Sequence, residues 1–138
     1  MLKGIDPVLG PDLLALLARM GHGDVIAVVD RNYPAHAAGV PVVELAVDLP
    51  RALEAVLGLM PVDRFQEHPL RHMLTDDGAD GPALADVRAV VDLAEGRAVG
   101  ALGVDRLAFY PAARSCFCVV RTTEERPYAC VMVAKGVV

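Results

Sequence analysis

The sequence predicts one α/β domain over residues 1–138, with three layers formed by a mainly parallel sheet and the helices flanking it. Amphipathic helices alternate along the chain with short apolar strands. Residues 25–29 form a continuous, largely β-branched run, which is typical of a parallel strand buried on both faces. The chain has the length of a single domain, and 54% of its residues are hydrophobic, so it can bury a core of its own.

A helix is predicted to precede this strand. Pro11 suits the first helical position because its missing N–H would have no partner there. Apolar side chains from Leu13 to Met20 then recur at helical spacing and form one stripe. Gly21 or Gly23 can end the helix in a left-handed conformation.

The next segments predict a weaker strand and a second helix. Residues 30–34 break the first strand with turn-forming side chains. Residues 40–45 are a strand candidate that Pro41 moves towards an edge of the sheet or to a strand start. Asp48 is expected to cap a helix over residues 51–60, in which apolar side chains recur at i, i+3, i+4 and i+7.

The second half of the chain has a less regular pattern. Residues 61–81 are mixed in character and end in an acidic, glycine-containing loop that we expect to be exposed. The predicted elements beyond it are a helix over 82–95, a short strand or loop over 107–109, and strands over 116–121 and 128–135 joined by a turn over 122–127.

Composition narrows the function classes. The formal net charge is −5, no Lys/Arg run occurs, and aromatic residues make up 4% without any Trp, so nucleic-acid binding is not expected. The opening residues contain an acid and a proline where a signal peptide needs an apolar run, and no stretch reaches the roughly 18 apolar residues of a membrane span. Three cysteines do not indicate a disulfide framework. We expect a cytoplasmic protein, and its mean hydropathy of +0.42 favours apolar surface buried between subunits.

Two polar groups lie where a core does not need them. His22 stands between Gly21 and Gly23, which permit unusual backbone angles and close approach of a ligand. Its imidazole can move a proton near neutral pH, or it can simply complete a helix C-terminal turn. Asp30 follows the buried strand, where α/β sheets bind ligands, although it is equally suited to capping a loop.

The C-terminal third adds Arg106, Phe109, Tyr110 and Tyr128. A tyrosine has a polar tip on an apolar body, which suits a small hydroxylated ligand. Buried tyrosines with a satisfied hydroxyl are nevertheless commoner than ligand-binding ones, and a single arginine is most often a solvated surface charge.

Other chemical motifs are weak. Cys116 and Cys118 would share one face of a strand, but no second Cys or His pair completes a zinc site, so they are interpreted as core thiols. His68 and His72 have metal-pair spacing on a helix, yet Pro69 lies between them. No phosphate loop, dinucleotide-binding fingerprint or nucleophile elbow occurs, so no metal or cofactor is predicted.

Several segments together resemble the fucose mutarotase and ribose pyranase family. The segments are MLKGI at the start, MGHGD at 20–24, Asp30 with Pro34-Ala35, RLAFY at 106–110, YAC at 128–130 and KGV at 135–137. They occur in the family's order and spacing, which is far more specific than one short motif. The resemblance implies an α/β fold that assembles into ring-like homo-oligomers, commonly decamers, with sites near subunit boundaries. It implies cofactor-independent interconversion of cyclic monosaccharide forms, and the Arg-x-x-Phe-Tyr segment is similar to the branch that acts on L-fucose.

The resemblance also implies residue roles. His22 matches the family's catalytic acid/base and Asp30 its sugar-binding carboxylate. Arg106 and Tyr128 fall at sugar-binding positions, and Tyr110 lies beside them. Cys130 stands where the family usually has an asparagine that contacts the sugar, and a thiol is a poor hydrogen-bonding substitute for an amide.

Three hypotheses follow. The first is an aldose mutarotase that opens and recloses the sugar ring by acid/base catalysis. The second is a non-catalytic sugar-binding or sensing protein on the same scaffold, motivated by Cys130. The third is a ring subunit without a ligand, which leaves the placement of His22, Asp30 and Tyr128 unexplained.

Overall fold

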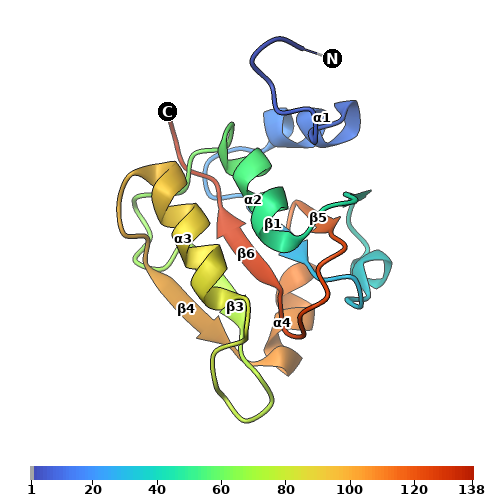
Figure 1. The fold of residues 1–138 in the computed structure, drawn as a ribbon, viewed down its shortest axis with the longest axis vertical. Coiled ribbons are helices and arrows are strands. Elements are labelled where there is room, and N and C mark those ends of the chain that lie inside the picture. The colour runs from blue at the N-terminus through green and yellow to red at the C-terminus, as the bar shows by residue number, and fades with distance from the viewer. Residues whose placement is uncertain (1) are drawn as a thin grey trace.

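A computed structural model describes residues 2–138, and Met1 of the opening segment lies outside it. Six strands form one sheet (Figure 1), and the helices on both of its faces confirm the predicted three-layer α/β architecture. In chain order the elements are α1 (Pro11–Arg19), β1 (Val25–Val29), the 3₁₀ helix η1 (Ala35–Ala38), β2 (Val42–Glu44), α2 (Leu49–Leu57), β3 (Leu70–Met73), α3 (Leu84–Glu95), β4 (Ala101–Val104), α4 (Arg106–Ala113), β5 (Cys118–Arg121) and β6 (Val131–Ala134).

The strand order is β2-β5-β1-β6-β3-β4, and β6 is antiparallel to both of its neighbours. The other pairs are parallel, so the carboxyl ends of five strands lie at the same edge as the amino end of β6. The turn over 122–127 therefore does not join two adjacent strands, because β1 lies between β5 and β6. We call the edge where β1 ends the carboxyl edge.

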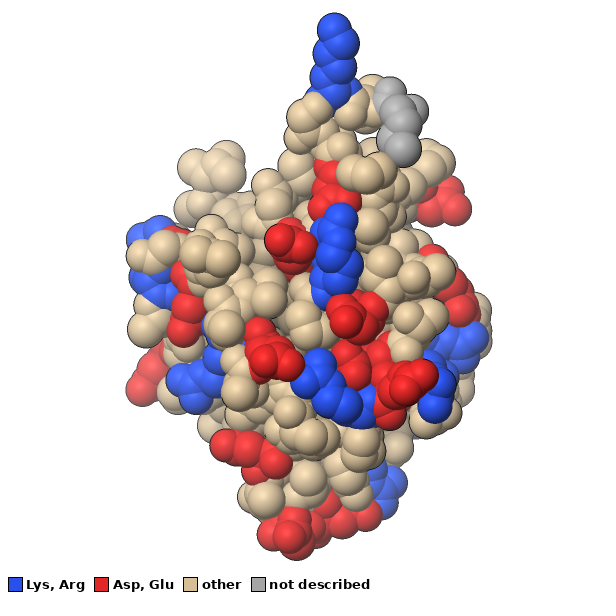
Figure 2. All heavy atoms as spheres, viewed as in Figure 1, with Lys and Arg blue, Asp and Glu red and all other residues tan. Residues whose placement is uncertain are grey.

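The alternating side chains of β1 divide the core into two layers. Ile26 and Val28 pack with α1, α2 and α3 on one face of the sheet, whereas Ala27 and Val29 pack with η1 and α4 on the other. A strand covered on both faces needs apolar side chains at successive positions, and this continuous apolar run is why β1 could be predicted from the sequence. In Figure 1, α2 and α3 lie in front of the sheet. Figure 2 shows acidic and basic side chains interspersed over that side, without an extended patch of one sign.

The expected short strand or loop over 107–109 is wrong, because these residues belong to helix α4. The Asp105 side chain caps this helix by accepting a hydrogen bond from the Leu107 backbone N–H at 3.1 Å. Phe109 is fully buried in the layer beneath the helix. The mixed stretch 61–81 also contains β3, and β4 follows α3; neither four-residue strand had been predicted.

Cys116 and Cys118 do not share a face, contrary to the prediction. Cys116 precedes β5 and packs in the layer under α4, while Cys118 is the first residue of β5 and packs in the opposite layer. Burial raises the pKa of Cys116 to about 12 and that of Cys118 to about 11. Both are therefore neutral core thiols at physiological pH, as their sequence context indicates.

The loop between β5 and β6 is fixed by a buried carboxylate. Glu124 accepts a hydrogen bond from the Leu49 backbone N–H at the start of α2 and another from the Arg126 Nε atom at 3.0 Å. The Arg126 guanidinium also reaches Asp86 on α3 at 2.7 Å. The loop that leads into Tyr128 is thereby held to both α2 and α3.

Protonation of Glu124 is expected to destabilise the protein in acid. The Arg126 hydrogen bond lowers the pKa of Glu124 from 4.5 to about 2. Its stabilising contribution is therefore complete above pH 4.5 and is lost as the pH falls towards 2. The free energy of unfolding should fall by up to about 3 kcal/mol over that range in the wild type. Denaturant titrations should show that the free energy of unfolding falls less with pH in Glu124→Gln. The control is Glu125→Gln, a change at the exposed neighbouring residue, which should keep the pH dependence of the wild type. Equal pH dependences in the two variants would contradict the assignment to Glu124.

Candidate functional site

A cavity of about 260 Å³ opens at the carboxyl edge, and we call it the edge pocket. Five residues predicted from the sequence line it, because the topology brings the end of β1, the start of α4 and the start of β6 to one place. The full lining is Asp30, Asn32, Tyr33, Pro34, Met73, Arg106, Tyr110, Pro127, Tyr128 and Cys130. Positions about 100 residues apart in the sequence thus meet where parallel sheets commonly bind ligands.

Asp30 is a buried carboxylate with hydrogen bonds to both of its oxygens. Its Oδ1 atom accepts from the Asn32 backbone N–H at 2.9 Å, and its Oδ2 atom lies 3.5 Å from the Cys130 thiol, which donates to it. Burial, together with the nearby Asp30 charge, raises the pKa of Cys130 well above its ordinary value. Cys130 is therefore a neutral thiol that donates to the Asp30 side chain.

Arg106 is held at the mouth of the pocket by Asp76, which comes from the loop after β3. The Arg106 Nε atom donates to Asp76 Oδ1 at 2.7 Å, and Arg106 Nη2 lies 3.5 Å from Asp76 Oδ2. This bond lowers the pKa of Asp76, so the carboxylate stays charged and the guanidinium stays paired. The exposed acidic loop expected from the sequence therefore orients a predicted sugar-binding residue.

The aromatic lining combines a strained residue with a stacked pair. Tyr128 has φ 58°, in the left-handed region that a non-glycine residue seldom adopts and that costs about 1–3 kcal/mol. Tyr33 and Tyr110 stack with ring centroids 5.6 Å apart. The lining of the edge pocket thus combines polar groups with aromatic and sulfur-containing side chains.

His22 lies at the opposite edge of the sheet. Helix α1 ends at Arg19 with Met20 extended, so neither glycine closes it, and Gly23 adopts φ 86° in the turn before β1. The Gly23 backbone N–H donates to the Lys135 carbonyl at 2.8 Å. The five residues of β1 span about 16 Å. His22 precedes this strand and Asp30 follows it, so the length of β1 separates the two residues. One chain therefore does not bring His22 into its own edge pocket.

Asp63, which the sequence analysis missed, is the partner of His22. The His22 Nε2 atom lies 3.0 Å from Asp63 Oδ1, and Asp63 is only 2% exposed. The Phe65 backbone N–H and the Gln66 side-chain amide also donate to this carboxylate. These bonds, that from Phe65 first, lower the pKa of Asp63, so it remains charged beside the imidazole. No local motif marks Asp63 in the irregular stretch between α2 and β3.

The structure also tests the candidate metal pair His68 and His72 and the possibility of a membrane-spanning helix. His72 lies on β3 and His68 precedes that strand, so the two do not share a helix face. Within residues 2–138, no three His, Cys, Asp or Glu side chains are grouped as a metal ion would require. None of the helices in this part of the chain combines the length and the apolar character needed to cross a membrane.

Comparison with known proteins identifies the family. Residues 3–138 match the RbsD / FucU transport protein family. The chain is 36% identical to the L-fucose mutarotase of Glaesserella parasuis, over 99% of this chain and 96% of that protein, and 36% identical to the fucose mutarotase of Homo sapiens, over 99% and 94%. It also resembles the crystal structure of the Streptococcus pneumoniae fucose mutarotase in complex with L-fucose, with a TM-score of 0.90, 29% identity and 99% of each chain covered. The match confirms the resemblance found in the sequence: this chain belongs to the RbsD / FucU transport protein family.

Proposed function

We propose that this protein is a sugar mutarotase that interconverts the anomers of L-fucose. The observation that carries the proposal is the edge pocket, in which Asp30, Arg106 and Tyr128 converge from separate segments. Relatives named as fucose mutarotases match this chain over 99% of its length, which supports the same reaction class.

The lining of the edge pocket suits a 6-deoxy sugar. Asp30 can accept hydrogen bonds from sugar hydroxyls, and the Arg106 guanidinium can donate to sugar oxygens. Met73, Tyr110 and Cys130 offer apolar surface for the C–H face of the ring and for the methyl group that L-fucose carries in place of a hydroxymethyl. A neutral thiol at position 130 favours this apolar contact over the hydrogen bond that an amide would make.

The reaction needs only proton transfers. An acid gives a proton to the ring oxygen as the bond between the anomeric carbon and the ring oxygen breaks. The base that remains then takes the proton of the anomeric hydroxyl, which leaves the free aldehyde. The free aldehyde rotates about its bond to the adjacent carbon, and the ring closes on the other face as the two protons return. The products have the same atoms and the same number of electrons as the substrate.

His22 is the proposed acid/base, and Asp63 is its positioning residue. Imidazole gains and loses a proton near neutral pH, so one group can serve both directions. Asp63 engages the Nε2 atom, while Nδ1 makes no hydrogen bond to any of residues 2–138. The His22 side chain is 45% exposed, so the sugar can reach its free edge. Asp63 fixes the ring and stabilises it when it is protonated.

A second copy of the chain must supply His22 to each edge pocket. Within one chain these groups lie at opposite ends of β1, whereas proton transfer requires contact with the sugar. A heterologous contact, in which the amino edge of one copy meets the carboxyl edge of the next, closes into a ring when its rotation allows. We therefore propose a ring-like homo-oligomer, such as a decamer, in the reducing cytoplasm that its free thiols suit.

Saturation-transfer NMR tests the activity. Irradiating one anomeric proton of L-fucose should reduce the signal of the other anomer when catalytic amounts of the protein are present. L-fucose, D-ribose and D-galactose form the panel. Acceleration with L-fucose supports the proposal, whereas no acceleration with any of the three contradicts it. Binding by calorimetry without acceleration would instead select the non-catalytic sugar-binding function that Cys130 motivates.

A further inference from the structure

Phe65 is an aromatic side chain that the fold presents to solvent. It is 77% exposed, and it is the one aromatic residue among the exposed large apolar side chains of residues 2–138. The Asp63 carboxylate accepts a hydrogen bond from the Phe65 backbone N–H at 3.0 Å, which fixes the turn from which the Phe65 ring projects. Its centroid lies 5.3 Å from that of His22. A large apolar side chain held in this way is typical of an interaction surface.

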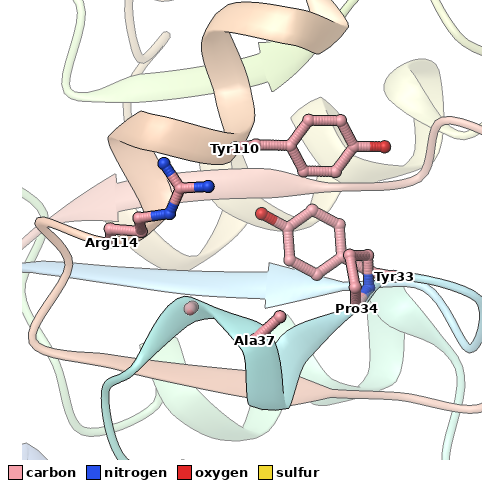
Figure 3. Close-up of a pocket in the computed structure, with 6 residues that line it drawn as sticks. Tyr33, Pro34, Ala37, Tyr110 and Arg114 are labelled. Atoms are coloured by element: carbon pink, nitrogen blue, oxygen red, sulfur yellow. The ribbon is translucent and has the colours of Figure 1, made fainter.

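An apolar cavity of about 280 Å³ adjoins the edge pocket, and we call it the side cavity (Figure 3). Its lining is Tyr33, Pro34, Ala37, Ala38, Tyr110 and Arg114. The first two of these and Tyr110 also line the edge pocket, so the two cavities share a wall. Burial raises the pKa of Tyr33, which keeps its hydroxyl neutral. The side cavity therefore suits an apolar occupant.

We propose that the side cavity receives Phe65 of a second copy of this chain, when that copy's His22 enters the edge pocket. This inference rests on the proposed function, which requires a second copy to supply His22. Phe65 and His22 are in ring contact, and the two cavities share a wall. One rigid docking movement can therefore seat both side chains.

The side cavity has the size and the chemistry for a phenyl ring. A cavity of about 150 Å³ is enough to hold benzene, so the side cavity has room for the Phe65 side chain. Pro34 and the two alanines offer apolar contact. Arg114 makes no ion pair with any of residues 2–138, and its guanidinium can lie over the face of an inserted ring. Figure 3 shows the Tyr33 hydroxyl pointing towards Arg114 and the Tyr110 hydroxyl pointing away.

Phe65 would thus act as the anchor that sets where His22 meets the sugar. Interface energy concentrates in a few buried aromatic side chains, and truncating one typically weakens association by about 30-fold or more. Loss of the anchor should therefore reduce both assembly and catalysis, even though the acid/base itself is intact. Phe65 is a positioning residue in this account, because it does not contact the substrate.

Phe65→Ala tests the anchor, with Leu93→Ala as the matched control. Leu93 is 84% exposed on α3, so truncating it also removes exposed apolar surface. Light scattering over a protein concentration series should show that Phe65→Ala dissociates at concentrations about 30-fold higher than wild type or Leu93→Ala. Its anomer exchange per subunit should fall at low protein concentration and recover at high concentration. Unchanged assembly and exchange would overturn the inference, as would a raised KM with unchanged assembly, because Phe65 would then contact the sugar.

A cross-link tests the contact itself. The chain with Phe65→Cys and Ala37→Cys should form covalent oligomers under mild oxidation on a non-reducing gel, because the three native cysteines are buried. The chain with Leu93→Cys and Ala37→Cys should remain monomeric on that gel. If the first cross-link does not form and Phe65→Ala leaves assembly and anomer exchange unchanged, the docking is overturned. The mutarotase proposal still stands in that case, provided that the wild type exchanges anomers. A wild type without exchange overturns the function, and the cross-link still decides the docking.

Discussion

Replacing His22 with glutamine is expected to lower the rate of anomer exchange by about 10²- to 10⁴-fold, which is the usual contribution of a general acid/base. Glutamine keeps a polar side chain of similar length but cannot take up and return a proton at neutral pH. The histidine is half-exposed and its side chain bonds to Asp63 alone among residues 2–138. The fold should therefore survive the substitution. Saturation-transfer NMR measures the rate, and circular dichroism with light scattering checks the fold and the assembly.

His36→Gln is the matched control for this prediction. His36 is also an exposed histidine whose Nε2 atom lies 3.0 Å from a carboxylate oxygen, that of Glu44. It lines neither the edge pocket nor the side cavity. Its loss should leave exchange unchanged. Wild-type exchange in His22→Gln, or equal losses in the two variants, would assign the acid/base role elsewhere.

Asp30→Asn is expected to lower kcat/KM for L-fucose by about 10- to 100-fold. A hydrogen bond to a charged acceptor contributes about 1.5–3 kcal/mol, and the amide removes the charge that the sugar hydroxyls would meet. The amide oxygen can still accept from the Asn32 backbone N–H, but an N–H₂ group replaces the oxygen that accepts from the Cys130 thiol. The kinetic measurement is exchange rate against sugar concentration. The control is Asp12→Asn, an exposed change in the first turn of α1, which should leave kcat/KM unchanged. An unaltered kcat/KM in Asp30→Asn would show that the Asp30 carboxylate does not bind the sugar.

The sequence predicts the elements whose patterns are local. The run at 25–29 identifies β1 because a strand buried on both faces needs apolar side chains at every position. Asp48 caps α2 as expected, since its side chain accepts from the Arg51 backbone N–H. β3 and β4 escape prediction because four-residue strands contain too few positions for a period, and β3 includes the polar residues Arg71 and His72.

The site is only partly predictable for a related reason. Asp30 is predicted from its place after β1, whereas the roles of Arg106 and Tyr128 are implied only by the family resemblance; the sheet order brings the three together. That order is a long-range property, and the insertion of β6 between β1 and β3 has no local signal. Asp63 was missed because its role depends on its hydrogen bond to His22, 41 positions away. The exposure of Phe65 likewise depends on the turn that Asp63 pins.

Mixing two impaired variants tests whether each site joins His22 of one copy to Asp30 of another. His22→Gln and Asp30→Asn chains would be co-expressed in equal amounts, and saturation transfer of L-fucose would be measured on the mixed oligomer. With random assembly, half of the pockets retain Asp30 and half of the neighbours retain His22, so about a quarter of the sites are intact. Exchange should therefore recover to about a quarter of the wild-type rate. A rate no higher than the average of the two variants measured separately would contradict it.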